Sequence, residues 1–303
     1  MSNTYSKIKF LKNLSGTTAL VTAALLIVPV QASYAADVVV NNTVSSTQTV
    51  GAGDSLTISA TGSVTADPAV QVNTPGATFI TNNGTIEGTG TTALQMTGGT
   101  LSGALKNTGT IKVSDTTNTS STIYGIYMGT SAAVAGGFTN SGTISASVSA
   151  TDGSSITQQA YGMYVDGTST LNSFTNTATG TISASANVTS TGAGSEVVAQ
   201  ALSVTGGSTI TNNFTNAGKI TATAKSVGVD YTSATATAYG IYMDNATIGG
   251  AFVNSGTVSA NAFADMADSY YAEANAYAIL IDNSTVNSFS NTGTISSSAT
   301  ANG

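Results

Sequence analysis

One short motif dominates the pattern of apolar and polar positions along this chain. It can be written apolar-x-Asn-x-Gly-(Thr/Lys)-apolar, and its clearest copy runs from Phe138 to Ile144 as Phe-Thr-Asn-Ser-Gly-Thr-Ile. Copies begin at Ile80, Leu105, Phe138, Phe174, Phe214, Phe252 and Phe289, so successive copies lie 25 to 40 residues apart. A signature that recurs at such intervals is typical of proteins built from stacked repeats.

The spacing inside one copy predicts a strand that is bent at Asn-x-Gly. The first and last apolar residues are six positions apart, so they point to the same face of an extended strand. Asn and Gly between them favour tight bends and positive φ. One copy cannot bury its own apolar face, but stacked copies can, with Phe over Phe and Asn bonded to Asn. The expected ladder residues are Phe138, Phe174, Phe214, Phe252 and Phe289, with Asn140, Asn176, Asn216, Asn254 and Asn291.

Stacking of this kind predicts an all-β protein, a right-handed parallel β-helix (β-solenoid) with about seven recognisable coils and an N-terminal cap. Each coil should advance the axis by about 4.8 Å. We assign residues 36–78 to the cap and the first coils, with strands at Ser55–Ser59 and Ala69–Val72. Residues 79–303 form the repeats, which we expect to continue beyond Gly303 in a longer protein. Two extra residues in the copy at Phe174 predict a bulge at its bend.

A second strand in each coil carries tyrosines. The pattern Tyr-Gly-Ile-Tyr-Met and its variants occupy Tyr124–Met128, Tyr161–Val165, Tyr239–Met243 and Tyr277–Ile281, whereas Ala201–Val204 fills the same place without tyrosine. Such residues should form aromatic ladders. A tyrosine row can be a platform for sugars or bases, but packing explains it better, because Ile126 and its equivalents alternate with the rings.

Between the two strands the chain alternates small residues, as in Ile144–Ala150 and Ile220–Ala224. This alternation predicts half-buried strands whose alanines allow two sheet walls to approach closely. The tips carry Asp152, Glu196, Asp230, Asp265 and Asp268. We interpret them as a solubilising edge, with a cation- or partner-binding edge as the alternative.

Residues 1–35 have the pattern of a signal peptide. Lys7, Lys9 and Lys12 precede an apolar stretch at Ala19–Val30, and Ser33-Tyr34-Ala35 offers a cleavage site after Ala35. The apolar stretch is too short for a spanning helix, which needs about 20 residues. Without this segment 4 Lys remain against 14 Asp and Glu, a net charge of −10 (4 − 14). Such a charge disfavours nucleic acid and anionic membrane surfaces.

Composition narrows the possible chemistry further. The chain has no Cys and no His, and 41% of its residues are hydrophobic, which argues against disorder. Gly53-Asp54-Ser55-Leu56 spells the nucleophile block of GDSL esterases, but the serine would lack a histidine base. We therefore expect no catalytic, cofactor-binding or metal-ligating residues. Asp166, Asp244 and Asp282 follow the tyrosine strands, where turn formation explains them. A flat threonine face of the ice-binding kind is disfavoured because Lys219 interrupts the row.

The signal peptide, the Asn-x-Gly-Thr-Ile repeats and the Tyr-Gly-Ile-Tyr strands together resemble the passenger region of bacterial autotransporters (type V secretion). The resemblance covers nearly all of residues 36–303. It implies export, passage through an outer-membrane β-barrel translocator for which residues 1–303 show no pattern, and display at the cell surface or release. The expected function is a non-enzymatic adhesin or structural spacer that binds glycans, host matrix or neighbouring cells along its stacked-coil faces. The alternative is a polysaccharide-acting β-helix hydrolase or lyase.

Overall fold

The structure, a computed structural model, describes residues 35–117, 119–152, 155–191, 194–228, 233–266 and 271–303. They belong to one compact unit, Ala35–Gly303. The described residues form strands, turns and bends without any helix, so none of them forms a helix long and apolar enough to cross a membrane. The predicted signal peptide, residues 1–35, lies outside the described residues except for Ala35, and it stays a prediction.

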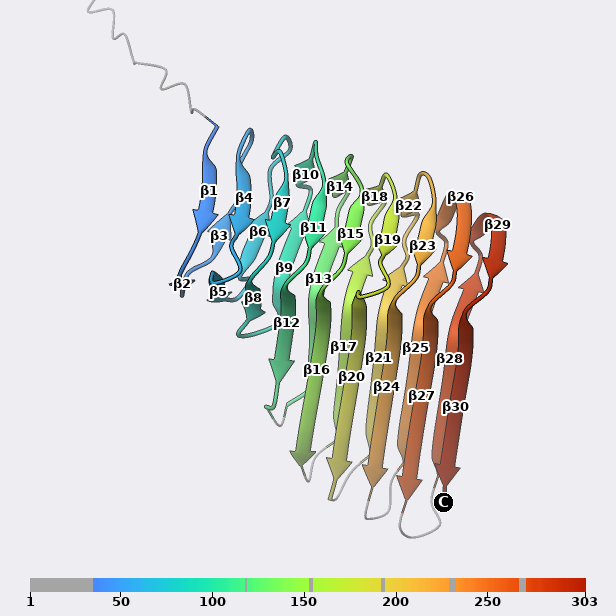
Figure 1. Cartoon of the computed structure of the whole chain (residues 1–303). Coiled ribbons are helices and arrows are strands. Elements are labelled where there is room, and N and C mark those ends of the chain that lie inside the picture. Colours follow the sequence, from blue (N-terminus) through green and yellow to red (C-terminus); the bar gives the residue numbers. More distant parts are fainter. Residues whose placement is uncertain (1–34, 118, 153–154, 192–193, 229–232, 267–270) are drawn as a thin grey trace, which may run out of the picture. The chain divides into compact units, whose positions relative to one another are not determined.

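The described strands form three sheets, named A, B and C here, in which all pairings are parallel (Figure 1). Sheet A contains β1 (Asp37–Val40), β4 (Ser55–Ile58), β7 (Ile80–Asn82), β11 (Leu105–Asn107), β15 (Phe138–Asn140), β19 (Phe174–Asn176), β23 (Phe214–Asn216), β26 (Thr247–Asn254) and β29 (Thr285–Asn291). It also contains the short strands β10 (Thr100–Leu101), β14 (Ala133–Val134), β18 (Thr170–Leu171) and β22 (Thr209–Ile210).

Sheets B and C are stacked in the same order. Sheet B contains β2 (Thr43–Val44), β5 (Ser63–Ala66), β8 (Thr85–Gly88), β12 (Thr110–Asp115), β16 (Thr143–Asp152), β20 (Thr181–Ser190), β24 (Lys219–Gly228), β27 (Thr257–Met266) and β30 (Thr294–Asn302). Sheet C contains β3 (Gln48–Thr49), β6 (Val70–Val72), β9 (Thr92–Thr97), β13 (Ser121–Gly129), β17 (Ile156–Val165), β21 (Ser195–Val204), β25 (Ala234–Asp244) and β28 (Ala272–Asp282). The chain visits A, B and C in turn, which confirms the predicted parallel β-helix; its right-handed sense stays a prediction.

The phenylalanines of the motif stack in register along sheet A. Phe138 pairs with Phe174, Phe174 with Phe214, and Phe214 with Phe252. The ring centroids of these three pairs are 5.2, 4.5 and 4.4 Å apart. The first four rings are at most 1% exposed. Phe289, on the last described turn, stacks on Phe252 at 4.9 Å but is 49% exposed.

The motif asparagines form a continuous hydrogen-bonded ladder that runs in one direction. The Nδ2 of each donates to the Oδ1 of the next, from Asn82 through Asn107, Asn140, Asn176, Asn216 and Asn254 to Asn291, at 2.7 to 2.9 Å. The same Nδ2 of Asn140 donates to the carbonyl oxygen of Thr181 at 3.2 Å. Each ladder asparagine from Asn82 to Asn254 is 0% exposed. The ladder therefore satisfies polar groups that burial would otherwise leave unpaired.

The motif glycine has a different role from the one that the sequence suggests. Gly142 has no positive φ, so the expected left-handed bend is wrong there. A Cβ at Gly142 would lie 2.0 Å from the carbonyl oxygen of Gly109, and one at Gly109 would lie 2.1 Å from that of Gly84. Glycine is therefore required because the backbone of the preceding coil approaches too closely for any side chain.

The first coils use the same frame with other residues. Val38–Val40 pairs with Leu56–Ile58, which pairs with Ile80–Asn82. Val40 and Ile58 thus stand in the asparagine column, so the ladder begins at Asn82 above an aliphatic side chain. The coils at 37–72 are continuous with the later ones in all three sheets. The copy at Phe174 keeps its register on both sides, while its extra residues form a turn before Gly180.

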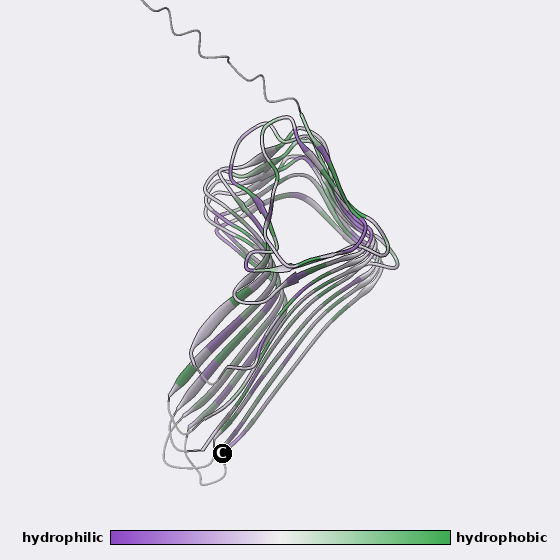
Figure 2. Cartoon of the chain, turned by 90° about the vertical axis from the view of Figure 1, so that its left-hand side faces the viewer, coloured by the Kyte–Doolittle hydropathy of each residue, from purple (hydrophilic) through white to green (hydrophobic). Residues whose placement is uncertain are grey.

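From β16 onward, sheets B and C extend beyond the three-sided part of the coil as the two walls of an arm (Figure 2). The inward positions of one wall are alanines that stack from coil to coil: Ala146, Ala184, Ala222 and Ala260, each at most 2% exposed. Ser195 and Ser226 bring their Oγ atoms to 2.6 Å across the walls. Small side chains let the two walls pack directly against each other.

We expect Asn176→Ile to lower the free energy of unfolding by about 2–4 kcal/mol, because it deprives both Asn140 and Asn216 of a ladder partner in the interior. Asn82→Ile should cost about half as much, since only one other asparagine of the ladder, Asn107, loses a partner and Ile58 already occupies the column below. Denaturant titrations would measure both. Equal losses of unfolding free energy in the two variants would contradict a contribution from each ladder bond. No loss in Asn176→Ile would show that the ladder does not stabilise the fold.

Phe214→Ala should cost about 3–5 kcal/mol, because it opens a cavity between two buried rings. Phe289→Ala is the matched control and should cost less than half of that, since half of this ring is already in solvent. Thermal unfolding of the two variants would compare them. A larger effect at Phe289 would contradict the stacking.

Candidate functional site

The tyrosines of sheet C lie on its outer face. Residues between them point inward, and Ile126, Met163, Leu202 and Ile241 are all 0% exposed. The rings themselves are partly exposed, and Tyr277 is 40% exposed. We call this set the tyrosine strip; it consists of Tyr124, Tyr127, Tyr161, Tyr164, Tyr239, Tyr242 and Tyr277. The sequence interpretation of these residues as packing is incomplete, because the rings pack on one another at the surface.

A bend at the glycine of Tyr-Gly-Ile-Tyr brings the paired tyrosines together. On a straight strand, residues three apart are about 10 Å from each other and point to opposite faces. In β13, however, Tyr124 and Tyr127 are both on the outer face with ring centroids 5.1 Å apart. A Cβ at Gly125 would lie 2.5 Å from the carbonyl oxygen of Gly162. Glycine therefore permits both the bend and the close approach of the next coil.

The strip is a pair of stacked columns. Tyr124 stacks on Tyr161 with centroids 5.1 Å apart and an interplanar angle of 17°, and Tyr127 stacks on Tyr164 at 5.9 Å and 15°. Further along, Tyr239 stacks on Tyr277 at 5.2 Å and 11°. Two stacked rings hold each other in place, so the strip presents rigid aromatic surface.

Polar side chains line one side of the strip. Asp166, Thr205 and Asp244 follow the register-matched residues Val165, Val204 and Met243, and Asp282 pairs with Asp244. The Thr205 hydroxyl donates to Asp166 Oδ1 at 3.1 Å, and Tyr164 Oη lies 3.4 Å from the same hydroxyl oxygen. The backbone carbonyl of Asp166 accepts hydrogen bonds from the amide and hydroxyl of Ser169, consistent with a turn.

Burial and neighbouring hydroxyls favour the neutral form of Tyr124 and Tyr161. Burial, and then the proximity of Tyr164, raises the pKa of Tyr124 to about 12. Burial raises the pKa of Tyr161 further, with contributions from Tyr124 and Tyr164. Near neutral pH these phenols therefore carry a proton and can donate hydrogen bonds.

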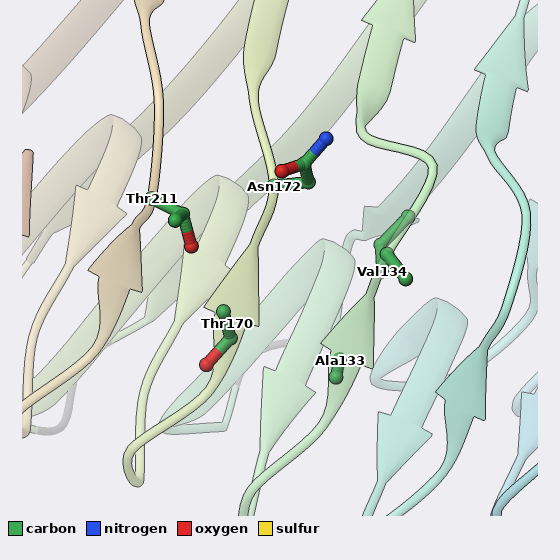
Figure 3. A pocket seen from close by; sticks show the side chains of 6 residues that line it. Ala133, Val134, Thr170, Asn172 and Thr211 are labelled. Atoms are coloured by element: carbon green, nitrogen blue, oxygen red, sulfur yellow. The ribbon is translucent and has the colours of Figure 1, made fainter. Parts of the chain in front are cut away.

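Two shallow hollows lie elsewhere on the surface. One, of about 250 Å³, is lined by Ala133, Val134, Ala135, Thr170, Asn172 and Thr211, from neighbouring turns (Figure 3). The other, of about 330 Å³, is lined by Phe79, Thr81, Gly103, Ala104 and Lys106. Neither lining includes a carboxylate, so neither brings together the acids that a glycosidase would use.

The other candidate site residues from the sequence analysis do not come together in one place in the structure. Ser55 is buried and hydrogen-bonds to Asp37, while the Asp54 carboxylate accepts from the amide nitrogens of Gly51 and Ala36. At the arm tips, Glu196 is exposed and Asp265 is partly exposed. Asp230 and Asp268 lie outside the described residues. Within the described part of the chain no three His, Cys, Asp or Glu residues gather closely enough to hold a metal ion.

Comparison of the chain with protein-family models, with curated proteins and with solved structures gives no match.

We expect alkaline pH to destabilise the protein through the tyrosine strip. The neutral form is favoured in the fold, where the pKa of Tyr124 is about 12 against 10.0 for a free side chain. This contribution to stability is complete below pH 10 and is lost as the pH rises toward 12, because the unfolded chain ionises first. Denaturation midpoints from pH 8 to pH 12, with tyrosinate absorbance, would measure it. Ionisation of every tyrosine near pH 10 would contradict the expectation.

Proposed function

We propose that the chain is a non-enzymatic, passenger-like β-helix that is exported and displayed at a cell surface or released, and that it acts as an adhesin. The tyrosine strip would be its binding surface and surface glycans its ligands. The observation that carries the proposal is the outward position of the stacked rings. Core packing does not require aromatic residues there, because the inward positions of sheet C already fill the core.

The chemistry of the strip suits carbohydrate. Tyrosine combines an apolar face with a hydroxyl, and it gives rigid contact area at low cost in conformational entropy. The apolar faces of sugar rings can lie on the tyrosine rings, while sugar hydroxyls reach the phenols, Thr205 and Asp166 beside them. Stacking repeats from coil to coil, so several sugars of one chain could be bound along the axis, and linked contacts raise avidity.

The charge around the strip favours carbohydrate over single-stranded nucleic acid, which also stacks on aromatic rings. Single-stranded nucleic acid also lies on tyrosines, but its binding depends on a positively charged groove. Here Asp166, Asp244 and Asp282 flank the rings, and without residues 1–35 the chain carries a net charge of −10 (4 Lys against 14 Asp and Glu). Phosphate backbones would be repelled.

A glycan array probed with the full chain tests the proposal. We expect retention on a subset of glycans, and we expect the double variant Tyr127→Ser, Tyr277→Gln to weaken it about tenfold or more. Both substitutions copy residues that the chain itself carries in these columns, Ser203 and Gln200. They should therefore leave the fold intact.

The matched control is Ser147→Ala with Thr223→Ala, at exposed, register-related positions on the outer face of sheet B. It should leave retention unchanged. Equal retention by all three proteins would remove the strip from the proposal. Release of reducing sugar from a bound polysaccharide would favour the polysaccharide-acting hydrolase or lyase instead.

A further inference from the structure

The hollow of about 250 Å³ lies on the outer face of sheet A, at the short strands β14, β18 and β22 (Figure 3). Inward positions of these strands fill the core, since Val134, Leu171 and Ile210 are at most 1% exposed. The residues on either side of them point outward and supply most of the lining. We call this space the alanine hollow; it is lined by Ala133, Val134, Ala135, Thr170, Asn172 and Thr211.

Small side chains in one coil create the alanine hollow. Ala133 pairs in register with Thr170 of the next coil. Ala135 stands beside Asn172, because the Asn172 backbone amide donates to the carbonyl of Val134 at 3.1 Å. Both outward positions of this coil thus hold alanine, where the next coil holds threonine and asparagine. The side-chain atoms that are missing over one coil leave the open space.

Asn172 directs an unused hydrogen-bond donor toward the alanines. Its Oδ1 accepts from Nδ2 of Asn212 at 2.8 Å, which fixes the orientation of the amide. Figure 3 shows its amide nitrogen turned to the other side, toward the coil of Ala133 and Val134. Among the described residues this nitrogen has no hydrogen-bond partner, because alanine at position 135 offers no side-chain acceptor. A ligand in the hollow can therefore bond to it.

Two hydroxyls complete the polar part of the lining. Thr170 and Thr211 come from successive coils, and neither hydroxyl bonds to another residue in the described part of the chain. Each can donate one hydrogen bond and accept others. The lining contains no charged side chain. An ionic ligand would lose hydration without gaining an opposite charge, so the hollow suits a neutral one.

Size and chemistry together indicate the occupant. Pockets for drug-sized ligands measure about 300–1,000 Å³, so a hollow of about 250 Å³ suits a single small ring with its substituents. The methyl groups of Ala133 and Ala135 suit an apolar methyl, and Nδ2 of Asn172 requires an acceptor such as a carbonyl. An acetamido group supplies both. On a sugar ring it is accompanied by hydroxyls, which suit Thr170 and Thr211.

We propose that the alanine hollow is a second glycan site, which binds the acetamido group of one neutral N-acetylhexosamine unit. In the complex Asn172 Nδ2 donates to the acetyl carbonyl, the acetyl methyl covers the two alanines, and ring hydroxyls bond to the threonines. This inference goes beyond the proposed function, because the hollow lies on sheet A and the tyrosine strip on sheet C. Either site can fail without the other.

The decisive variant is Ala133→Thr with Ala135→Asn, which copies the residues of the next coil, Thr170 and Asn172. It fills the hollow and gives the Asn172 amide nitrogen an acceptor. We expect it to keep the denaturation midpoint of the unaltered chain or raise it, and to lose N-acetylhexosamine affinity at least about tenfold. The matched control is Thr247→Val, in the same outward column but outside the lining. It should bind as the unaltered chain does.

A second variant leaves the shape of the hollow unchanged. Asn172→Asp keeps an oxygen that accepts from Asn212 and replaces the donor Nδ2 by another acceptor. We expect about a fivefold loss of affinity, the size of one hydrogen bond. A merely structural role for Asn172 predicts unchanged binding.

Saturation-transfer NMR on the full chain would measure binding of the methyl glycosides of N-acetylglucosamine and N-acetylgalactosamine. We expect dissociation constants on the order of 1 mM for such small ligands. The methyl glycosides of glucose and galactose, and an N-acetylated amino acid amide, should bind at least about tenfold more weakly, since each lacks either the acetyl group or the ring hydroxyls.

Three results would overturn the inference: no saturation transfer from the unaltered chain, equal binding of the ligands without the acetamido sugar, or undiminished binding by Ala133→Thr, Ala135→Asn. Binding that is lost instead in Tyr127→Ser, Tyr277→Gln would place the sugar on the tyrosine strip, against this inference and in favour of the proposed function. Binding that persists in that variant, with no effect of the variant on array retention, would support the hollow and remove the strip.

Discussion

The whole structure depends on each coil lying directly above the previous one. Inside, the amide of Asn140 must reach Asn176, which reaches Asn216, and these bonds at 2.8 to 2.9 Å tolerate no slip of a strand. At the bend, the carbonyl oxygen of Gly109 comes so close to Gly142 that a Cβ atom there would clash with it. The ladder fixes the register and the glycine permits the closeness. The stability of such a protein is approximately a sum over contacts between neighbouring coils. The asparagine and the glycine of the motif therefore recur from coil to coil.

Vertical alignment also decides what the surface can be. Any residue type that recurs at an outward position becomes a column along the axis, and the spacing between its members is set by the strands. The strip follows from this rule together with the bend at Gly125, which places Tyr124 and Tyr127 on one face. A surface of this kind repeats at a fixed interval and holds its side chains against one another. It suits a ligand that is itself a chain of similar units, and suits less a ligand that needs an enclosed pocket.

The sequence predicts the fold class because seven motif copies share one order of residues, and the three parallel sheets confirm it. The motif itself does not mark the coils at Val38 and Leu56, which lie in the segment predicted to hold the cap and the first coils, since Val40 and Ile58 stand where asparagine marks the later copies. The outward position of the tyrosines was not predictable from alternation, because the bend at Gly125 shifts the parity of the strand. The reason for the motif glycine was also hidden, since it lies in another coil, 33 residues earlier, at Gly109. The repeat can be recognised from the local sequence pattern. The orientation of the tyrosines and the need for the motif glycine depend on strand bending and on contacts between coils, which the local pattern does not show.

A repeat that is broken on one face alone is informative. Leu202 and Ala199 keep their places in the inner columns of β21, so this coil is under the same packing constraint as its neighbours. Only its outward positions, Gln200 and Ser203, depart, and they depart together, with two unpaired polar atoms that are unfavourable for stability. Repetition of tyrosine would have removed that cost, since rings stack favourably in the adjacent coils. The stacking of coils therefore constrains the inner face of the repeat, and it leaves the outer face free to change in a single coil.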